Sequence, residues 1–211
     1  MENINQQIAA QLLQINAIKF NPANPFQWTS GWKSPIYCDN RKTLSFPGLR
    51  KLIRDAFVEL IQRVYGKPDV IAGVATGAIA MGALTAEAME LPFVYVRSSQ
   101  KKHGLHNTIE GHLEKGQRVV VVEDLVSTGK SSLQAVEALR QQHARVMGMV
   151  AIFTYGFETA RENFEEKKCP LHTLSDYSGM LEVALREGYL EQENMQDLEQ
   201  WRRDPSNWGQ S

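Results

Sequence analysis

Short runs of consecutive apolar residues alternate along the chain with longer segments in which apolar residues recur every three or four positions. An uninterrupted apolar run is typical of a strand buried on both faces, and apolar residues at helical spacing indicate an amphipathic helix. On this basis we predict strands at 70–75, 93–96, 119–122, 146–155 and 171–174. We predict helices at 4–18, 47–65, 78–90, 133–142, 180–189 and 195–203.

This alternation predicts an α/β fold in which a mainly parallel sheet is flanked by helices and its strands are joined by right-handed crossovers. Ligands of such sheets bind beyond the carboxyl ends of the strands. Thr76, Arg97 and the pair Glu123–Asp124 each follow a predicted strand. We therefore expect them to gather at one edge of the sheet.

Two carboxylates and a hydroxyl-rich turn follow the valine strand at 119–122. Gly129 lets the backbone approach a ligand closely, and the N–H groups that begin the next helix would point at an anion. The turn is not a nucleotide-triphosphate P-loop, because Asp124 stands where that motif requires its first glycine. An ordinary turn between a buried strand and a helix is the alternative that needs no ligand.

The acids and the turn resemble the phosphoribosyl diphosphate (PRPP) motif of the type I phosphoribosyltransferases. The resemblance implies that Glu123 and Asp124 contact the ribose hydroxyls of PRPP. It also implies that the turn binds the 5-phosphate through Leu125, Val126, Ser127, Thr128, Gly129, Lys130 and Ser131. Lys130 replaces a usual small residue; it either adds a cation near the phosphate or points to solvent, and we expect solvent.

Thr76 and Gly77 form a short turn after the strand at 70–75. Backbone amides in such a turn can face an anion, and the family places its pyrophosphate loop here. Gly73, Gly77 and Gly82 fit close packing of a helix on a strand equally well. The position of the turn, not its composition, favours PRPP binding.

A long polar loop occupies 97–112, and loops of this length in a compact domain are usually disordered or functional lids. Its three histidines allow a metal site as an alternative, but no cysteine or acid is spaced to complete the ligand set. Arg97, Lys101 and His103 match the catalytic loop of the family members that act on orotate. The resemblance implies that these three residues are catalytic and that, with Lys102, they bind PRPP.

Residues 26–41, which we call the hood, contain Ser-Gly-x-Lys-Ser-Pro-x-Tyr-x-Asp-x-Arg. They resemble the segment that covers the base in the family members that act on orotate. An aromatic-rich loop that only covers the core is the alternative. The orotate-binding candidates are Lys33, the amides of Tyr37 and Cys38, Arg41 and the Ser127 hydroxyl. Two departures concern these contacts: Thr29 stands where some members carry lysine, and the strand near Tyr155 lacks an arginine that some use.

The chain has 211 residues, a net charge of −1 and two cysteines. This composition shows no basic footprint for nucleic acid, no disulfide framework and no apolar run of membrane-spanning length. We see no signal peptide, so we expect a cytoplasmic protein that binds neither membranes nor nucleic acid. We expect an N-terminal helix and hood at 1–45, completed by the C-terminal tail, a PRPP-binding core at 46–190 and a C-terminal helix and tail at 191–211.

The resemblance covers nearly the whole chain and implies transfer of the phosphoribosyl group of PRPP to orotate in pyrimidine biosynthesis. It implies Mg²⁺ as cofactor, carried mainly by PRPP rather than by protein ligands, and a homodimer in which the lid reaches into the neighbouring site. Two alternatives stay open. One is a phosphoribosyltransferase for a purine or uracil, and the other is a PRPP-sensing regulator without turnover.

Overall fold

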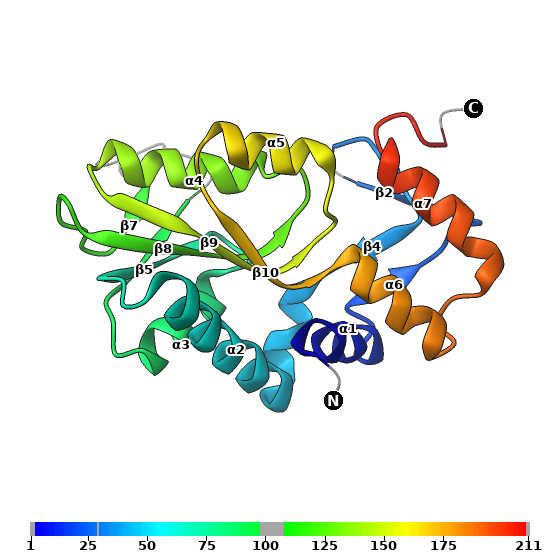
Figure 1. The fold of residues 1–211 in the computed structure, drawn as a ribbon, viewed down its shortest axis with the longest axis horizontal. Coiled ribbons are helices and arrows are strands. Elements are labelled where there is room, and N and C mark those ends of the chain that lie inside the picture. The colour runs from blue at the N-terminus through cyan, green and yellow to red at the C-terminus, as the bar shows by residue number, and fades with distance from the viewer. Residues whose placement is uncertain (1–2, 29, 98–107, 210–211) are drawn as a thin grey trace.

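The computed structural model describes residues 3–28, 30–97 and 108–209. A six-stranded sheet crosses this part of the chain (Figure 1). Its strands, in spatial order, are β10 (Leu171–Asp176), β9 (Arg145–Thr154), β8 (Arg118–Val126), β5 (Val70–Val74), β6 (Phe93–Val96) and β7 (Ile109–Glu110). Neighbouring strands are parallel except β6 and β7, which are antiparallel. The predicted mainly parallel α/β fold is confirmed.

Helices cover both faces of this sheet (Figure 1). One face carries α4 (Lys130–Gln141) and α5 (Glu158–Glu166), and the other carries α1 (Ile4–Gln14), α2 (Pro47–Tyr65) and α3 (Ile79–Ala88). Val120 and Val122 belong to the buried cluster formed with α1 to α3, whereas Val119 and Val121 belong to the cluster formed with α4 and α5. The valine strand is thus buried on both faces, as its apolar run predicts.

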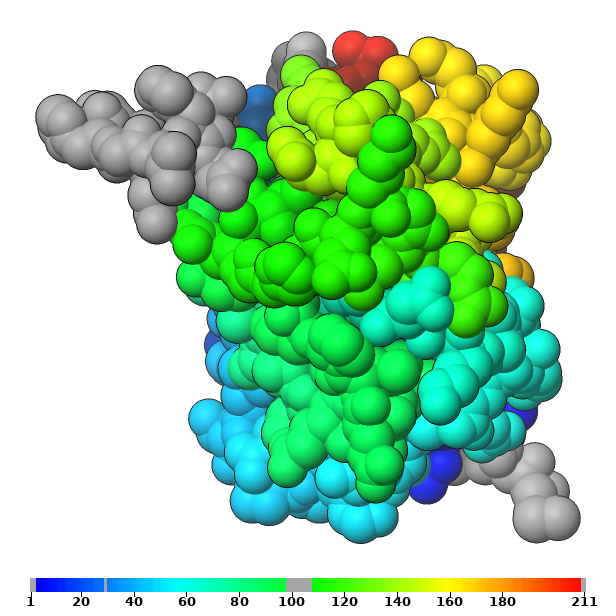
Figure 2. All heavy atoms as spheres, turned by 90° about the vertical axis from the view of Figure 1, so that its left-hand side faces the viewer, coloured from blue at the N-terminus to red at the C-terminus, as the bar shows by residue number. Residues whose placement is uncertain are grey.

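Short elements next to the sheet form the hood and the C-terminal end. They are β1 (Ile18–Phe20), β2 (Phe26–Gln27), β3 (Lys33–Ser34), β4 (Ile36–Cys38), the 3-10 helices η1 (Asn40–Ser45) and η2 (Gln192–Asn194), and the helices α6 (Tyr177–Arg186) and α7 (Met195–Arg203). β1 pairs with β4 and β2 pairs with β3, both antiparallel. In the space-filling view, α2 and α3 form the lower part of one face and α4 and α5 the upper part (Figure 2).

The first predicted helix is too long at its C-terminal end. α1 ends at Gln14, Asn16 has a φ of 54°, and Ile18 begins β1 instead of a further helical turn. Asparagine tolerates this left-handed conformation, which commonly ends a helix. The apolar residues after it therefore extend the helical pattern without extending the helix.

The central strand and its neighbours also differ from the prediction. β8 continues through both acids to Val126, because Glu123 and Leu125 still have ladder partners in Ala151 and Phe153. The end of the predicted lid forms β7, so the loop is shorter than 97–112. α4 begins at Lys130 instead of 133, and α6 spans Tyr177–Arg186 instead of 180–189. Shifts of one or two residues affect the ends of α3, β5, β9 and β10.

Residues of all three expected segments meet in one buried cluster, which includes Ile8, Phe57 and Trp201. The three segments thus share one core, and the boundaries expected at 45 and 190 stay a prediction. Within the described ranges, none of the helices combines the length and the apolar character that crossing a membrane needs.

Candidate active site

Glu123 and Asp124 lie near the carboxyl end of β8. Glu123 is only 5% exposed; its Oε2 accepts a hydrogen bond of 2.8 Å from Ser132 Oγ, and its Oε1 accepts one of 3.0 Å from the Asp124 amide. Burial raises the pKa of Glu123, and the neighbouring charge of Asp124 raises it further. This environment favours a proton on Glu123 and leaves Asp124 as the more accessible acid.

The Asp124 carboxylate lies directly against Gly77, in the turn that follows β5. A Cβ atom added to Gly77 would overlap that carboxylate, so only glycine leaves room for it. Burial raises the pKa of Asp124, and its hydrogen bond with Glu123 and the charge of Arg41 oppose this rise. Gly77, Asp124 and Arg41 thus come together from three segments that the sequence keeps far apart.

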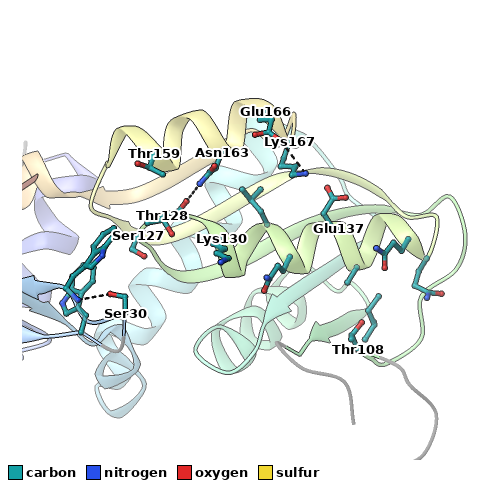
Figure 3. A pocket seen from close by; sticks show the side chains of 18 residues that line it. Ser30, Thr108, Ser127, Thr128, Lys130, Glu137, Thr159, Asn163, Glu166 and Lys167 are labelled. Carbon is teal, nitrogen blue, oxygen red and sulfur yellow. Dashed lines mark hydrogen bonds and ion pairs between the residues drawn. The ribbon is translucent and has the colours of Figure 1, made fainter. Parts of the chain in front are cut away.

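The turn after β8 has the conformation that an anion site needs. Gly129 caps α4 with a φ of 77°, and an added Cβ would meet the Phe164 ring at 2.6 Å. The N–H groups of the first helical turn lack intrahelical acceptors and carry partial positive charge. Asn163 donates a hydrogen bond of 2.9 Å to the Thr128 carbonyl and ties the turn to α5 (Figure 3). Lys130 is exposed, and its role stays a prediction.

A cleft of about 1050 Å³ reaches this turn from the outside (Figure 3). Ser127, Thr128 and Lys130 line one end of it, where the hood contributes Trp28, Ser30 and Trp32. From there the cleft follows α4 and α5 away from the acids, so its shape alone does not define the site. The contact between Gly77 and Asp124 instead marks the part of the candidate site that contains the two acids.

Arg97 stands where the lid leaves β6. Its backbone N–H donates to the Thr108 carbonyl at 2.8 Å, and its guanidinium lies 3.3 Å from the carboxylate of Glu110. Arg97 and Ser131 line the same cavity of about 230 Å³ between β6 and α4. Arg97 is thereby held beside the turn that follows β8.

Lys101, Lys102 and His103 lie outside the described residues, and so does Thr29. Their roles stay predictions. Within the described part of the chain, no group of three or more His, Cys, Asp or Glu residues could hold a metal ion. Of the lid histidines, His112 is described, and its ring nitrogen lies 3.3 Å from Glu114.

The hood candidates occupy different environments. Lys33 Nζ donates a hydrogen bond of 2.6 Å to the Gly209 carbonyl, so its ammonium contacts the C-terminal tail. Arg41 is exposed and pairs with Asp39 at 2.7 Å. Tyr37 is 39% exposed, and its ring packs 5.6 Å from that of Phe26.

The two amides proposed for orotate differ in availability. Asp39 donates to Ala17 and Asn21 donates to Pro35 across the β1–β4 pair. Hydrogen-bonded pairs alternate along an antiparallel ladder, so the Tyr37 amide faces β1 and the Cys38 amide faces away. Cys38 is therefore the better-placed donor. Its buried thiol donates to Asn40 Oδ1 at 3.2 Å, and burial raises the pKa of this thiol.

Sequence reasoning did not assign a role to Asn40, Asn163 or Trp201. Asn40 is buried and donates a hydrogen bond of 2.6 Å to the Asp124 carbonyl. Trp201 is buried and donates one of 3.1 Å to the Lys33 carbonyl. Asn40 lies within the hood, but at a position that the motif leaves unspecified. The partners of Asn163 and Trp201 are distant in sequence, so no local pattern marks these two residues.

Comparisons with known proteins identify relatives of this chain. A family model described as phosphoribosyl transferase domain matches residues 43–185. Orotate phosphoribosyltransferase of Bacteroides thetaiotaomicron is 58% identical over 99% of this chain and 98% of its own length. That of Porphyromonas gingivalis is 53% identical over 99% of this chain and its full length. The crystal structure of orotate phosphoribosyltransferase from Aeropyrum pernix has a TM-score of 0.76 at 28% identity, covering 87% of this chain and 99% of that one.

Proposed function

From the premise that this chain belongs to the orotate phosphoribosyltransferase family, we propose that Asp124, Gly77 and the turn at 125–131 form its PRPP site. The observation that carries the proposal is the contact between Gly77 and the Asp124 carboxylate, beside the anion-binding start of α4. A ribose with a phosphate at one end and a diphosphate at the other needs hydroxyl acceptors between two anion-binding turns. Asp124 lies between the turns that follow β5 and β8.

The enzyme transfers the 5-phosphoribosyl group of PRPP to orotate and gives orotidine 5-phosphate and pyrophosphate in pyrimidine biosynthesis. During displacement at the anomeric carbon, positive charge develops on the sugar and negative charge on the departing pyrophosphate. Stabilising such a reaction requires fixed charges and precise positioning rather than a covalent nucleophile.

The proposed roles follow from this charge distribution. Arg97, Lys101 and His103 stabilise the departing pyrophosphate, with Lys102 and the turn of Thr76 and Gly77 as further contacts. Asp124 orients the ribose hydroxyls, and Glu123, whose carboxylate oxygens accept internal hydrogen bonds, supports it through the Asp124 amide. The residues from Leu125 to Ser131 bind the 5-phosphate, and the fixed base of the lid at Arg97 supports this arrangement.

Mg²⁺ enters with PRPP in this proposal and neutralises charge on the diphosphate when it is bound. Glu123 is a poor ligand for it, because both carboxylate oxygens accept internal hydrogen bonds and burial raises its pKa. The Asp124 carboxylate is the more accessible of the two, and a hard cation prefers oxygen ligands. Asp124 is therefore the protein group best suited to face a magnesium ion on PRPP. We assign no direct protein ligand.

For orotate we propose the hood, with Lys33, the Tyr37 and Cys38 amides, Arg41 and the Ser127 hydroxyl as candidates for its carboxylate and ring. The geometry favours the Cys38 amide over that of Tyr37. We further propose a two-fold homodimer in which each lid completes the neighbouring site. The two cysteines are free thiols, which supports the proposed location in the reducing cytoplasm.

A base-by-base assay of PRPP-dependent pyrophosphate release tests the assignment of the base. Orotate differs from uracil by one carboxylate. When uracil binds, the hydrogen-bond donors that would bind this carboxylate are left unpaired. We expect discrimination against uracil of roughly a thousandfold or more in kcat/KM. Comparable turnover of uracil or hypoxanthine would show that the hood does not select orotate, even with an intact PRPP site.

A further inference from the structure

The β2–β3 hairpin of the hood forms one wall of the cleft beside the phosphate turn. Trp28, Ser30 and Trp32 line the cleft from this hairpin, opposite Ser127 and Thr128 (Figure 3). Within the described residues the hairpin pairs with no further strand. An isolated two-stranded hairpin is at best marginally stable in water. Its position in the protein must therefore come from other contacts.

Some of those contacts come from the residues that follow β9, because the Trp28 ring lies 5.0 Å from that of Tyr155 and 6.5 Å from that of Phe157. The others come from the C-terminal helix. Trp201 on α7 is fully buried, and its indole N–H donates a hydrogen bond of 3.1 Å to the Lys33 carbonyl of β3. Its ring packs against four others, with centroid distances of 5.6 Å to Trp28, 5.6 Å to Tyr155, 5.3 Å to Phe157 and 5.7 Å to Tyr177. Trp201 thus joins the hairpin backbone and one hairpin ring to the end of the sheet.

The tail after α7 holds the same hairpin residue from its other end. The Lys33 ammonium donates a hydrogen bond of 2.6 Å to the Gly209 carbonyl, and a Cβ atom added to Gly209 would meet the Lys33 side chain at 3.3 Å. Lys33 therefore has its main-chain carbonyl bonded to α7 and its side chain bonded to the tail.

We propose that Trp201 is a positioning residue for the orotate-binding part of the site. It fixes the hood hairpin through Lys33, with the help of the tail at Gly209. This inference rests on the proposed assignment of the hood to orotate. Orotate affinity then depends on the hydrogen bond between α7 and the hairpin. PRPP affinity does not, because the turns after β5 and β8 make no use of it.

The test compares Trp201→Phe with Tyr177→Phe. Both variants keep an aromatic ring in the same cluster, and both remove one buried donor, since the Tyr177 hydroxyl donates to the Leu198 carbonyl at 3.0 Å. Only Trp201 bonds to the hood. We expect Trp201→Phe to raise the KM for orotate about tenfold, the equivalent of one lost buried hydrogen bond, while the KM for PRPP stays within about twofold. Tyr177→Phe should leave both constants near those of the wild type.

Hydrogen exchange gives a second measurement at the hairpin itself. The amides of Trp28 and Gly31 donate within it at 2.9 Å each, to the carbonyls of Trp32 and Trp28. They should exchange about tenfold faster in Trp201→Phe and unchanged in Tyr177→Phe. A chain that ends at Asn207 keeps α7 but lacks the Gly209 acceptor, and it should raise the KM for orotate in the same direction.

Thermal unfolding sets a temperature at which all variants are folded. Equal KM values for orotate in Trp201→Phe and Tyr177→Phe, or unchanged exchange at Trp28 and Gly31, would overturn the positioning role. A wild-type enzyme that did not use orotate would instead overturn the proposed base, so the two failures are distinguishable.

Discussion

The side chain of Asn40 donates a hydrogen bond of 2.6 Å to the backbone carbonyl of Asp124, across 84 residues of sequence. Asn40 also accepts from the Cys38 thiol, and its own carbonyl accepts from Thr43 Oγ1 at 2.6 Å. It is buried at the point where the hood meets β8. One side chain therefore links the hood, the proposed orotate-binding part of the site, to the strand that carries Glu123 and Asp124.

Asn40→Ala should lower the free energy of unfolding by about 1–3 kcal/mol, because the Asp124 carbonyl loses a buried donor. It should also lower kcat/KM, since the Asp124 side chain follows its backbone. Chemical denaturation and steady-state kinetics measure the two effects. Asn21→Ala is the control, because the side chain of Asn21 accepts an exposed local hydrogen bond from the Asn24 amide, and its loss should cost less than about 0.5 kcal/mol. Equal effects of the two variants would show that Asn40 is not a structural link.

Gly77→Ala should damage PRPP use without unfolding the protein. The added methyl group occupies space that the Asp124 carboxylate now fills, so the carboxylate must move. Displacement of a positioning group by about 1 Å can cost roughly a hundredfold in rate, and we expect a loss of that order in kcat/KM for PRPP.

The matched control for this substitution is Gly48→Ala in the first turn of α2, where an added Cβ meets nothing within 4 Å. Alanine there should stabilise the helix slightly and leave activity unchanged. If Gly77→Ala were as active as Gly48→Ala, the contact with Asp124 would not matter for PRPP.

Glu123 should make stability depend on pH. Its pKa is raised in the folded protein, so the folded state binds more protons than the unfolded chain above the unfolded pKa of about 4.3. The contribution of this group to stability is therefore fully present below that pH and is lost as the pH rises through the folded pKa. Glu123→Gln removes this pH-dependent loss of stability. The Tm of the variant minus the Tm of the wild type should therefore rise from near zero at low pH as the pH approaches neutrality.

Thermal unfolding across this pH range measures the difference. Glutamine can keep both interactions, with its carbonyl accepting from the Asp124 amide and its amide donating to Ser132. Glu182→Gln on the exposed side of α6 controls for the removal of a carboxylate. A Tm difference that did not change with pH would contradict the raised pKa.

The sequence predicts features that depend on local pattern. The valines at 119–122 show double-sided burial, and Pro47 and Gly66 mark the two ends of α2. Hydroxyls, a glycine and a helix start predict an anion-binding turn at 125–131, because they are adjacent in the chain.

The remaining features depend on tertiary contacts. The end of α1 is set by the left-handed conformation of Asn16, although Ile15 and Ile18 continue the helical pattern. Lys33 carries the charge expected of a carboxylate ligand, yet its ammonium contacts Gly209, 176 residues away. Periodicity contains no information about such pairs, so Asn40, Asn163 and Trp201 could be recognised only in the folded structure.

The proposed sharing of sites between subunits makes a prediction about mixtures of two inactive enzymes. Lys101→Ala removes the cation that we expect to meet the pyrophosphate, and Asp124→Ala removes the acid beside Gly77; each alone should lower kcat strongly. If the lid completes the neighbouring site, a mixed dimer has one site with both defects and one site with neither. Random mixing makes half of all dimers mixed, so activity should recover to about a quarter of the wild type. Each variant carried alone through the same dissociation and reassociation is the control. If the lid instead serves its own subunit, every site keeps one defect, and dimers shown by mass spectrometry to be mixed should remain inactive.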